Sequence, residues 1–261
     1  MSSGLRTEIM STPTAIGDGL ARDIITGLRE AEAEGRTYVL GCPAGRTPAP
    51  VYRALAEQAR GLDLSRLHLI LMDEFVEPAG GGWQRIPAEA HHSCIGFAKR
   101  RILAGLPRLP LANLHAPDPA APEAYEGLIE SLGGIDLFLL ASGATDGHVA
   151  FNPPGTALDS RTRVVRLAEA TRQDNMSTFP AFQTLEDVPT HGVTVGLGTI
   201  ATHSRTVVMM LHGTQKAPAY ARLRGLERFD PLWPASVVFA CRRPRLVIDA
   251  ALAAALEAPA S

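Results

Sequence analysis

Asp146 and His148 place an acid and an imidazole two residues apart in the sequence. They follow the apolar run Ile135–Ala141, and Gly143 lies between, which is typical of a buried strand that ends in a loop. Loops at the carboxyl ends of strands are where open α/β sheets usually bind ligands. The pair is therefore a candidate for proton transfer; an Asp-Gly turn beside a histidine that only packs is the alternative.

Two adjacent carboxylates, Asp73 and Glu74, follow the apolar run 67–72, which is expected to be another strand. Neighbouring side chains on an extended chain point in opposite directions, so we expect one to face a cleft and the other to support it. Burial raises the pKa of a carboxyl group, and such a group can move a proton on a sugar carbon. A solvated acidic turn is the alternative.

The loop after the first expected strand is rich in small residues and leads into a helix at Ala49. Gly45 lets the backbone approach a ligand, and Thr47 offers a hydroxyl and a helix N-cap. Pro48 suits the first helical position, so free N–H groups and the positive end of the helix dipole would face the loop. With the donor fork of Arg46, this pattern indicates a phosphate site; an ordinary capped helix start is the alternative.

Two further cations could border the same ligand. Arg172 belongs to the polar segment 171–175, and Lys216 stands at the start of an expected helix. Guanidinium and ammonium groups at such positions suit a phosphate dianion. Most arginines and lysines are surface charges, so it is their occurrence together with the loop around Gly45 that makes Arg172 and Lys216 candidates.

Strand-like and helix-like segments alternate along the chain. Apolar residues recur at three-to-four spacing from Ala15 to Ala33, which is typical of an amphipathic helix on a sheet. Such alternation predicts βαβ units in a mostly parallel α/β sheet with helices on both faces, a Rossmann-like architecture. The expected strands are 37–40, 67–72, 135–141, 206–211, 236–240 and 246–248, and the further helices are 49–60, 94–106, 124–132 and 215–226.

No linker or block of like charge divides the 261 residues, so we expect one domain, residues 1–261. The loops 77–90 and 176–189 are rich in Gly, Pro and polar residues and are expected to be mobile covers of the site. The alanine-rich segment 250–258 is expected to be a terminal helix.

The chain has 25 Lys and Arg against 27 Asp and Glu, which gives no electrostatic reason to expect nucleic acid or an anionic membrane as a partner. Cys42, Cys94 and Cys241 are odd in number and widely spaced, which argues against a disulfide framework or zinc site and favours the cytoplasm. No histidine pair has metal-ligand spacing, and neither a signal peptide nor a membrane span is evident. A homo-oligomer is compatible with the sequence.

Taken in order, these motifs resemble the glucosamine-6-phosphate deaminase and 6-phosphogluconolactonase superfamily, and the deaminase (glucosamine-6-phosphate isomerase) branch in particular. The resemblance covers roughly residues 36–240. The segments that carry it are LGCPAGRTP (40–48), MDEF (72–75), DGHVAFN (146–152), SRTR (160–163), TR (171–172), VTVGLGT (193–199) and GTQKA (213–217).

The resemblance implies a single Rossmann-like domain with a modified doubly wound sheet, a hexose 6-phosphate substrate, and a reaction without metal or organic cofactor. It implies that His148 assists opening of the sugar ring while Asp146 orients the imidazole. Asp73 would then move a proton from C2 to C1 of the open aldose, and the resulting imine would be hydrolysed to a ketose phosphate and ammonia. The phosphate would be bound by Gly45, Arg46, Thr47, Arg172 and Lys216.

One departure from the family concerns the partner of His148. Deaminases of this kind continue the loop as Phe-Asn-Glu-Pro, where the glutamate partners the histidine in ring opening, but here Pro153 stands in its place. Loss of one acid–base group typically costs about 10²–10⁴-fold in rate, so deaminase efficiency depends on another acid replacing it. Asp159 and Glu74 are the candidates.

Two other functions stay open from the sequence. A 6-phosphogluconolactonase also keeps Asp-Gly-His, with His148 activating water, although lactonases typically follow the histidine with Thr-Ala-Ser, whereas this chain has Val-Ala-Phe-Asn. A catalytically weak sugar-phosphate sensor is the other. Sensors of this fold normally carry a DNA-binding domain, and the residues before the first expected strand lack a basic two-helix unit.

Overall fold

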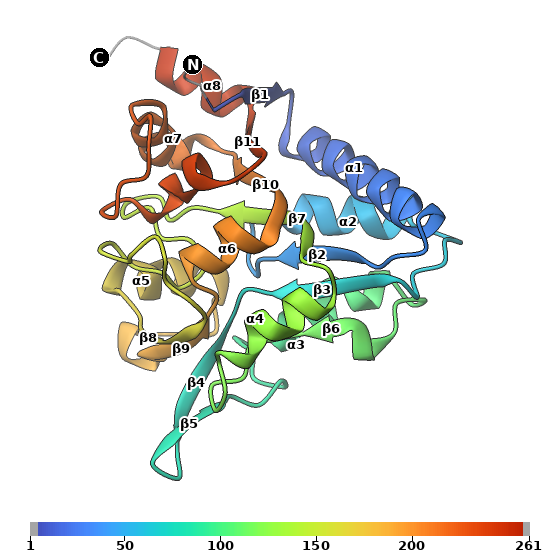
Figure 1. Cartoon of the computed structure of the whole chain (residues 1–261). Coiled ribbons are helices and arrows are strands. Elements are labelled where there is room, and N and C mark those ends of the chain that lie inside the picture. Colours follow the sequence, from blue (N-terminus) through green and yellow to red (C-terminus); the bar gives the residue numbers. More distant parts are fainter. Residues whose placement is uncertain (1–4, 258–261) are drawn as a thin grey trace.

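Seven parallel strands form the central sheet, and helices cover both of its faces (Figure 1). The computed structural model describes residues 5–257. The strand order is β1 (Thr7–Met10), β11 (Pro244–Asp249), β10 (Ser204–Leu211), β7 (Ile135–Ala141), β2 (Tyr38–Cys42), β3 (Leu67–Leu71) and β6 (Leu114–His115). From β2 the chain adds β3 and β6 in one direction, and from β7 it adds β10 and β11 in the other, which confirms the predicted doubly wound α/β architecture.

The direction of winding reverses between β2 and β7, which pair through Leu40 with Leu137 and Gly41 with Phe138. A Cβ atom at Gly41 would overlap the ring of Phe138, so only glycine leaves room for this ring between the two strands. Because both strands are parallel, the loops that follow them leave from the same edge of the sheet. That edge is where the structure places the candidate site.

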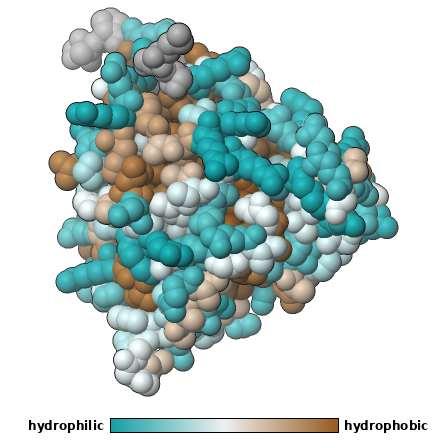
Figure 2. Space-filling view, viewed as in Figure 1, coloured by the Kyte–Doolittle hydropathy of each residue, from teal (hydrophilic) through white to brown (hydrophobic). Residues whose placement is uncertain are grey.

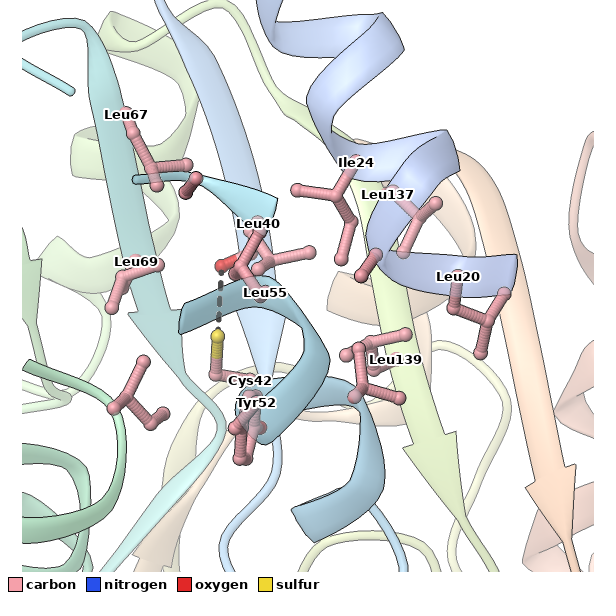
Figure 3. Close-up of a cluster of buried hydrophobic side chains, with 14 of the residues drawn as sticks. Leu20, Ile24, Leu40, Cys42, Tyr52, Leu55, Leu67, Leu69, Leu137 and Leu139 are labelled. Atoms are coloured by element: carbon pink, nitrogen blue, oxygen red, sulfur yellow. Dashed lines mark hydrogen bonds between the residues drawn. The ribbon is translucent and has the colours of Figure 1, made fainter. Parts of the chain in front are cut away.

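One face of the sheet packs against three helices. Alternate strand residues point to each face, so Leu40 of β2 belongs to this layer, whereas its neighbour Val39 belongs to the opposite one. Figure 3 shows side chains of two of these helices and of three strands meeting in this layer. Each fully buried leucine contributes about 1.5–3 kcal/mol to folding. The helices are α1 (Pro13–Ala33), α2 (Ala49–Gln58) and α3 (Cys94–Arg101).

The other face packs against a second set of helices, which share one hydrophobic cluster with the strands. The predicted terminal helix is observed as α8, which ends at Glu257, and Ala258 lies outside the described residues. These elements are α4 (Ala124–Ser131), α6 (Leu197–His203), α7 (Ala217–Arg224), α8 (Ala250–Glu257) and the 3₁₀ helix η5 (Pro234–Ala240).

The prediction of a strand at 236–240 is wrong, because this segment is the 3₁₀ helix η5. Ser236 bonds locally: its Oγ accepts from the N–H of Asp230 at 2.8 Å and donates to the carbonyl of Trp233 at 2.7 Å. These short-range bonds favour a helical turn over a sheet ladder. An apolar run of this length does not by itself distinguish a buried strand from a buried helix.

A small antiparallel sheet extends from the end of β3, and the sequence analysis did not predict it (Figure 1). The segment 77–90, predicted to be a loop, contains a hairpin. Gly80 and Gly81 form its turn with φ of +57° and +84°, as a two-residue hairpin loop requires. The strand order is β5 (Gly82–Arg85), β4 (Asp73–Ala79), β9 (His191–Thr194) and β8 (Arg163–Arg166).

The remaining elements are short, and one of them, α5, borders the site. Hydrophilic side chains cover much of the face shown in Figure 2, with hydrophobic atoms in scattered patches between them. Within residues 5–257, every helix is too short or too polar to cross a lipid bilayer. The short elements are η1 (Leu103–Gly105), η2 (Leu111–Asn113), α5 (Glu169–Thr178), η3 (Leu185–Asp187) and η4 (Thr214–Lys216).

Candidate active site

A cavity of about 490 Å³ opens at the carboxyl edge of the parallel sheet, between the loops that follow β2 and β7. Helix α5 and the 3₁₀ helix η4 contribute to its wall. This position is the switch point of the sheet, where α/β proteins usually bind ligands. Six of the sequence-predicted site residues line the cavity: Gly45, Arg46, Thr47, Asp73, His148 and Lys216.

The first turn of α2 differs from the predicted phosphate cradle. The helix begins at Ala49 with Pro48 at the capping position, so Thr47 is not the N-cap, and no side chain caps this end. The proline of the first turn is Pro50, which has no N–H to offer. Val51 already donates its N–H to the carbonyl of Pro48 at 2.9 Å. The helix end therefore has few free donors, and binding of an anion depends on the side chains of the preceding loop.

That loop is shaped by Gly45, whose φ of +108° lies in a region that side chains other than glycine rarely adopt. The turn carries Arg46 and Thr47 onto the cavity wall. His212 Nε2 lies 3.0 Å from the carbonyl oxygen of Thr47, which ties the loop to the residue that follows β10. His212 also lines the cavity, a placement that the sequence analysis did not anticipate.

Lys216 ends η4 with its ammonium group inside the cavity wall. Its Nζ donates to the carbonyl oxygen of Ser142 at 2.6 Å, which connects η4 to the loop after β7. Burial lowers the pKa of Lys216, and the positive charge of Arg46 adds to the effect. An anionic ligand between Arg46 and Lys216 would relieve this repulsion.

Arg172 is not brought together with the other predicted phosphate ligands. It lies on α5, but its side chain turns away from the residues that line the cavity. Its guanidinium donates to the carbonyl of Val188, with Nε at 3.3 Å, and to the carbonyl of Leu185. These contacts hold the segment after α5 in place and occupy Nε and Nη2 of the guanidinium.

Asp73 is the first residue of β4 and faces the cavity from a buried position, with only 6% of its surface exposed. The thiol of Cys94 donates to its Oδ1 at 3.3 Å. Burial raises the pKa of Asp73 from its usual range to about 7, which the hydrogen bond from Cys94 opposes. At neutral pH the group can therefore both release and accept a proton.

Glu74 is completely buried and points to the other side of β4, as expected for a strand neighbour. Its Oε1 accepts from the N–H groups of Phe75 at 2.8 Å and Cys94 at 2.9 Å. Its Oε2 accepts from the Ser93 hydroxyl at 2.7 Å and the Ile95 N–H at 2.9 Å. The carboxylate thus binds the amino end of α3, so Glu74 is not the replacement for the missing partner of His148.

Asp146 and His148 form a hydrogen-bonded pair, with Nδ1 of His148 2.7 Å from Oδ1 of Asp146. The same oxygen accepts from the backbone N–H of His148 at 3.1 Å. Burial disfavours the charge on Asp146, but the hydrogen bonds from His148 outweigh it and lower the pKa of Asp146. An ionised Asp146 keeps the proton on Nδ1, so Nε2 is the nitrogen available to a ligand.

The loop that carries this pair depends on its glycine and on an unusual backbone turn. A Cβ atom at Gly143 would overlap both Asp146 Oδ1 and His148 Nδ1. Ala150 follows with φ of +52°, a conformation that costs a non-glycine residue about 1 kcal/mol or more. Asn152 holds this turn, since its side-chain amide donates to the carbonyl of Val195 at 2.8 Å.

Two residues beside the predicted acids were not predicted from the sequence. Asp174 lies on α5 with Oδ2 3.9 Å from Nε2 of His148, and it lines the cavity. Cys94 lies beside Asp73. In the segment 171–175, only the arginine is a candidate from the sequence. The segment is polar and has too little hydrophobic periodicity to predict the helix that places Asp174. Asp159, the other candidate partner of His148, is exposed and does not line the cavity.

His91 and His92 contribute to packing. His91 and His92 stack edge-on or tilted against Phe182, with ring centroids 4.6 and 4.9 Å away. Among residues 5–257, no three His, Cys, Asp or Glu side chains are grouped in a way that could hold a metal ion. The arrangement of Asp73 and His148 in one cavity with the cations Arg46 and Lys216 is suited to proton transfer on an anionic ligand.

Comparison with known proteins gives a consistent result. A family model described as glucosamine-6-phosphate isomerases/6-phosphogluconolactonase matches residues 11–248. The glucosamine-6-phosphate deaminase of Pseudarthrobacter chlorophenolicus is 38% identical over 247 residues, which cover 91% of this chain and 88% of that protein. The glucosamine-6-phosphate deaminase of Rhodococcus opacus is 37% identical, with 95% of this chain and 92% of that protein covered.

Solved structures share the fold. A monomeric glucosamine-6-phosphate deaminase superimposes with a TM-score of 0.83 at 28% identity, over 96% of this chain and 100% of that one. A 6-phosphogluconolactonase from Shewanella baltica superimposes with a TM-score of 0.70 at 18% identity, over 96% of this chain and 100% of that one. At that identity the second likeness concerns the fold alone.

Proposed function

The chain belongs to the glucosamine-6-phosphate isomerase/6-phosphogluconolactonase family, and from that premise we propose that it is an amino-sugar 6-phosphate deaminase/isomerase. It would convert a substrate such as glucosamine 6-phosphate into a ketose 6-phosphate and ammonia. The observation that carries this proposal is the shared cavity, which has Asp73 and His148 among its lining residues together with Arg46 and Lys216. Relatives that are 37–38% identical over most of the chain and are named as deaminases support it.

The phosphate end of the substrate would lie against Gly45, Arg46, Thr47 and Lys216. Arg46 and Lys216 bring two positive charges to a dianion. Burial lowers the pKa of Lys216, so an anion bound beside the ammonium group would stabilise its charged form. Arg172 would join them only after giving up its bonds to Leu185 and Val188. Its predicted role therefore requires the segment after α5 to move when substrate binds.

Ring opening is the first chemical step. With Nδ1 held by Asp146, Nε2 of His148 would take the proton of the C1 hydroxyl and return it to the ring oxygen as the C1–O5 bond breaks. The product is the open aldose with an aldehyde at C1. The imidazole carries a positive charge only transiently, and the carboxylate of Asp146 stabilises it during that time.

Asp73 would then remove the proton from C2, while O1 takes up a proton from the substrate's own ammonium group, which gives a C1–C2 enol amine. Asp73 would deliver its proton to C1, and the nitrogen is then left as a protonated imine at C2. Water adds to this imine and expels ammonia, which leaves the ketose 6-phosphate. A carboxyl group whose pKa lies at about 7 suits both halves of the transfer at neutral pH. Hydrolysis of a lactone has no such carbon-to-carbon proton transfer, which favours the deaminase over the lactonase alternative.

The test is to incubate the purified protein with glucosamine 6-phosphate, its galactosamine epimer and 6-phosphogluconolactone, and to measure ammonia, ketose and acid. We expect ammonia and ketose in equal amounts from an amino sugar, and none from the Asp73→Asn and His148→Ala variants. Lactone hydrolysis that persists in Asp73→Asn, with no ammonia from either amino sugar, would overturn the proposal in favour of a lactonase. A ligand-dependent rise in Tm without any turnover would instead favour a sugar-phosphate sensor.

A further inference from the structure

We propose that Asp174 is a positioning residue for His148, holding the imidazole from the side opposite Asp146 during ring opening. This inference rests on the proposed deaminase function. Its starting point is the geometry of one ring: Nδ1 lies 2.7 Å from Asp146, and Nε2 lies 3.9 Å from Asp174. The second distance is too long for a hydrogen bond but is within the range of an ion pair with a protonated imidazole.

Helix α5 directs Asp174 into the cavity. Thr171, Asp174, Asn175 and Thr178 all line it, and their spacing of three, four and seven residues defines one face of a helix. The side-chain amide of Asn175 donates to the carbonyl of Thr171 at 2.8 Å, and the hydroxyl of Thr178 donates to the carbonyl of Asp174 at 3.2 Å. These polar groups are occupied by their own helix, which leaves the Asp174 carboxylate as the acid that this face presents.

The other acids near the loop are committed elsewhere or lie too far away. Pro153 has no carboxylate, and Glu74 accepts four hydrogen bonds at the amino end of α3 and in β4. Asp159 is exposed and outside the cavity wall. Among the described residues, Asp174 is thus the carboxylate within ion-pair distance of Nε2. It supplies, from a different element, a second anionic neighbour of His148, at the ring nitrogen that Asp146 does not contact.

Two groups that can carry a positive charge, His148 and Lys216, lie near the Asp174 carboxylate. Asp174 is 44% exposed and also attracts Lys216, so it could serve the lysine alone rather than the histidine. The two roles differ in their consequence: loss of a contact with His148 reduces kcat, whereas loss of a contact with Lys216 weakens binding of the phosphate and raises KM. Among the described residues, the titratable and charged side chains that face this ring or line the same cavity are Asp146, Asp174, Asp73, Cys94, His212, Arg46 and Lys216.

The experiment compares Asp174→Asn, Asp174→Glu and Glu169→Gln with the natural protein. Glu169 lies on the same helix, is exposed and does not line the cavity, so its variant removes one carboxylate from α5 without touching His148. Two measurements are made on each protein. One is the NMR titration of the His148 ring in the absence of substrate, and the other is the pH dependence of kcat and KM with glucosamine 6-phosphate.

We expect Asp174→Asn to move the titration of the His148 ring to lower pH and to reduce kcat by about tenfold, a modest loss because the contact is long and half exposed. The KM for glucosamine 6-phosphate should change less than kcat, and Asp174→Glu should restore both the titration and most of the rate. Glu169→Gln should resemble the natural protein in every measurement.

A titration curve of His148 that is identical in Asp174→Asn and Glu169→Gln would overturn the inference. So would a loss in Asp174→Asn that falls entirely on KM, since that would assign Asp174 to Lys216 and the phosphate. Failure of the proposed function is a separate result: the natural protein would then release no ammonia, while the titration, which needs no turnover, would still report on the ion pair.

Discussion

The two neighbouring carboxylates of β4 point to opposite faces of the strand and differ in the number of hydrogen bonds that they accept. Asp73 and Glu74 are both buried, and burial is the first cause of the raised pKa of each. Glu74 accepts hydrogen bonds from three backbone N–H groups and one hydroxyl. Asp73 accepts one, from the weak thiol donor of Cys94, and opens onto the cavity.

Burial alone therefore does not identify a reacting acid. A buried carboxylate that is surrounded by donors has no capacity left for a substrate, and its function is to hold an element in place. A buried carboxylate with a single weak donor has a pKa near neutral pH, and its oxygens remain available to a substrate. The comparison therefore assigns chemistry to Asp73 and support of α3 to Glu74, and each assignment has a distinct experimental signature.

The largest expected effect is on turnover in Asp73→Asn. Asparagine keeps the shape of the side chain but cannot carry a proton, so we expect kcat for glucosamine 6-phosphate to fall by about 10²–10⁴-fold, with a much smaller change in KM. Steady-state measurement of ammonia release checks this. Retention of more than a tenth of the activity would contradict the assignment of Asp73.

The same variant also has a predicted effect on stability. Burial raises the pKa of Asp73 to about 7 in the folded protein, so its contribution to stability is present at low pH and is lost as the pH rises through 7. The asparagine side chain of the variant does not ionise and carries no such penalty. The Tm of Asp73→Asn should therefore exceed that of the natural protein by an amount that grows between about pH 5 and pH 7.5.

The next largest effect is expected in Gly143→Ala, which extends the comparison to the loop after β7. The added Cβ would overlap Asp146 and His148, so the pair must separate, and we expect about a 10²-fold loss of kcat. Gly127→Ala is the matched control, because nothing lies near a Cβ atom at that position of α4. Equal activities of the two variants would mean that the hydrogen-bonded pair is not needed.

Glu74→Gln should show the opposite behaviour to Asp73→Asn. Its amide would face backbone donors with an N–H₂ group of its own, and we expect the free energy of unfolding to fall by about 1–3 kcal/mol. Urea denaturation measures this loss. The kcat of the folded fraction should stay within about tenfold of the natural value, and a loss as deep as that of Asp73→Asn would place Glu74 in the chemistry as well.

The parts of the molecule that could be predicted are those with a local signal. The apolar runs of β3 and β7, and the loop from Asp146 to His148, could be identified because each lies in one continuous segment with a clear pattern. The small antiparallel sheet could not, since β4 pairs with β9 from a distant part of the chain and the pairing is stabilised by contacts that only the fold creates.

The directions in which side chains point could not be predicted from the sequence either. Arg172 and Asp174 stand two residues apart on one helix, and only the arginine could be recognised as a candidate from its type and neighbours. The helix turns Arg172 toward carbonyl groups of the segment around η3 and turns Asp174 toward His148. Such an assignment depends on where α5 docks, which no feature of the segment 169–178 encodes by itself.

The smallest expected effect, and the finest test of the comparison, concerns the single donor to Asp73. The thiol of Cys94 stabilises the ionised form, so Cys94→Ala should raise the pKa of Asp73 and move the acidic limb of the pH–rate profile to higher pH. Activity should then fall by a few-fold at about pH 6 and change little at about pH 8.5. Cys94→Ser keeps a donor of nearly the same size, and a hydroxyl donates more strongly than a thiol. The acidic limb of the pH–rate profile of this variant should therefore lie at the same pH as in the natural protein or at a lower pH. A shift of the same size and direction in both variants would indicate altered packing around β4 rather than the lost hydrogen bond.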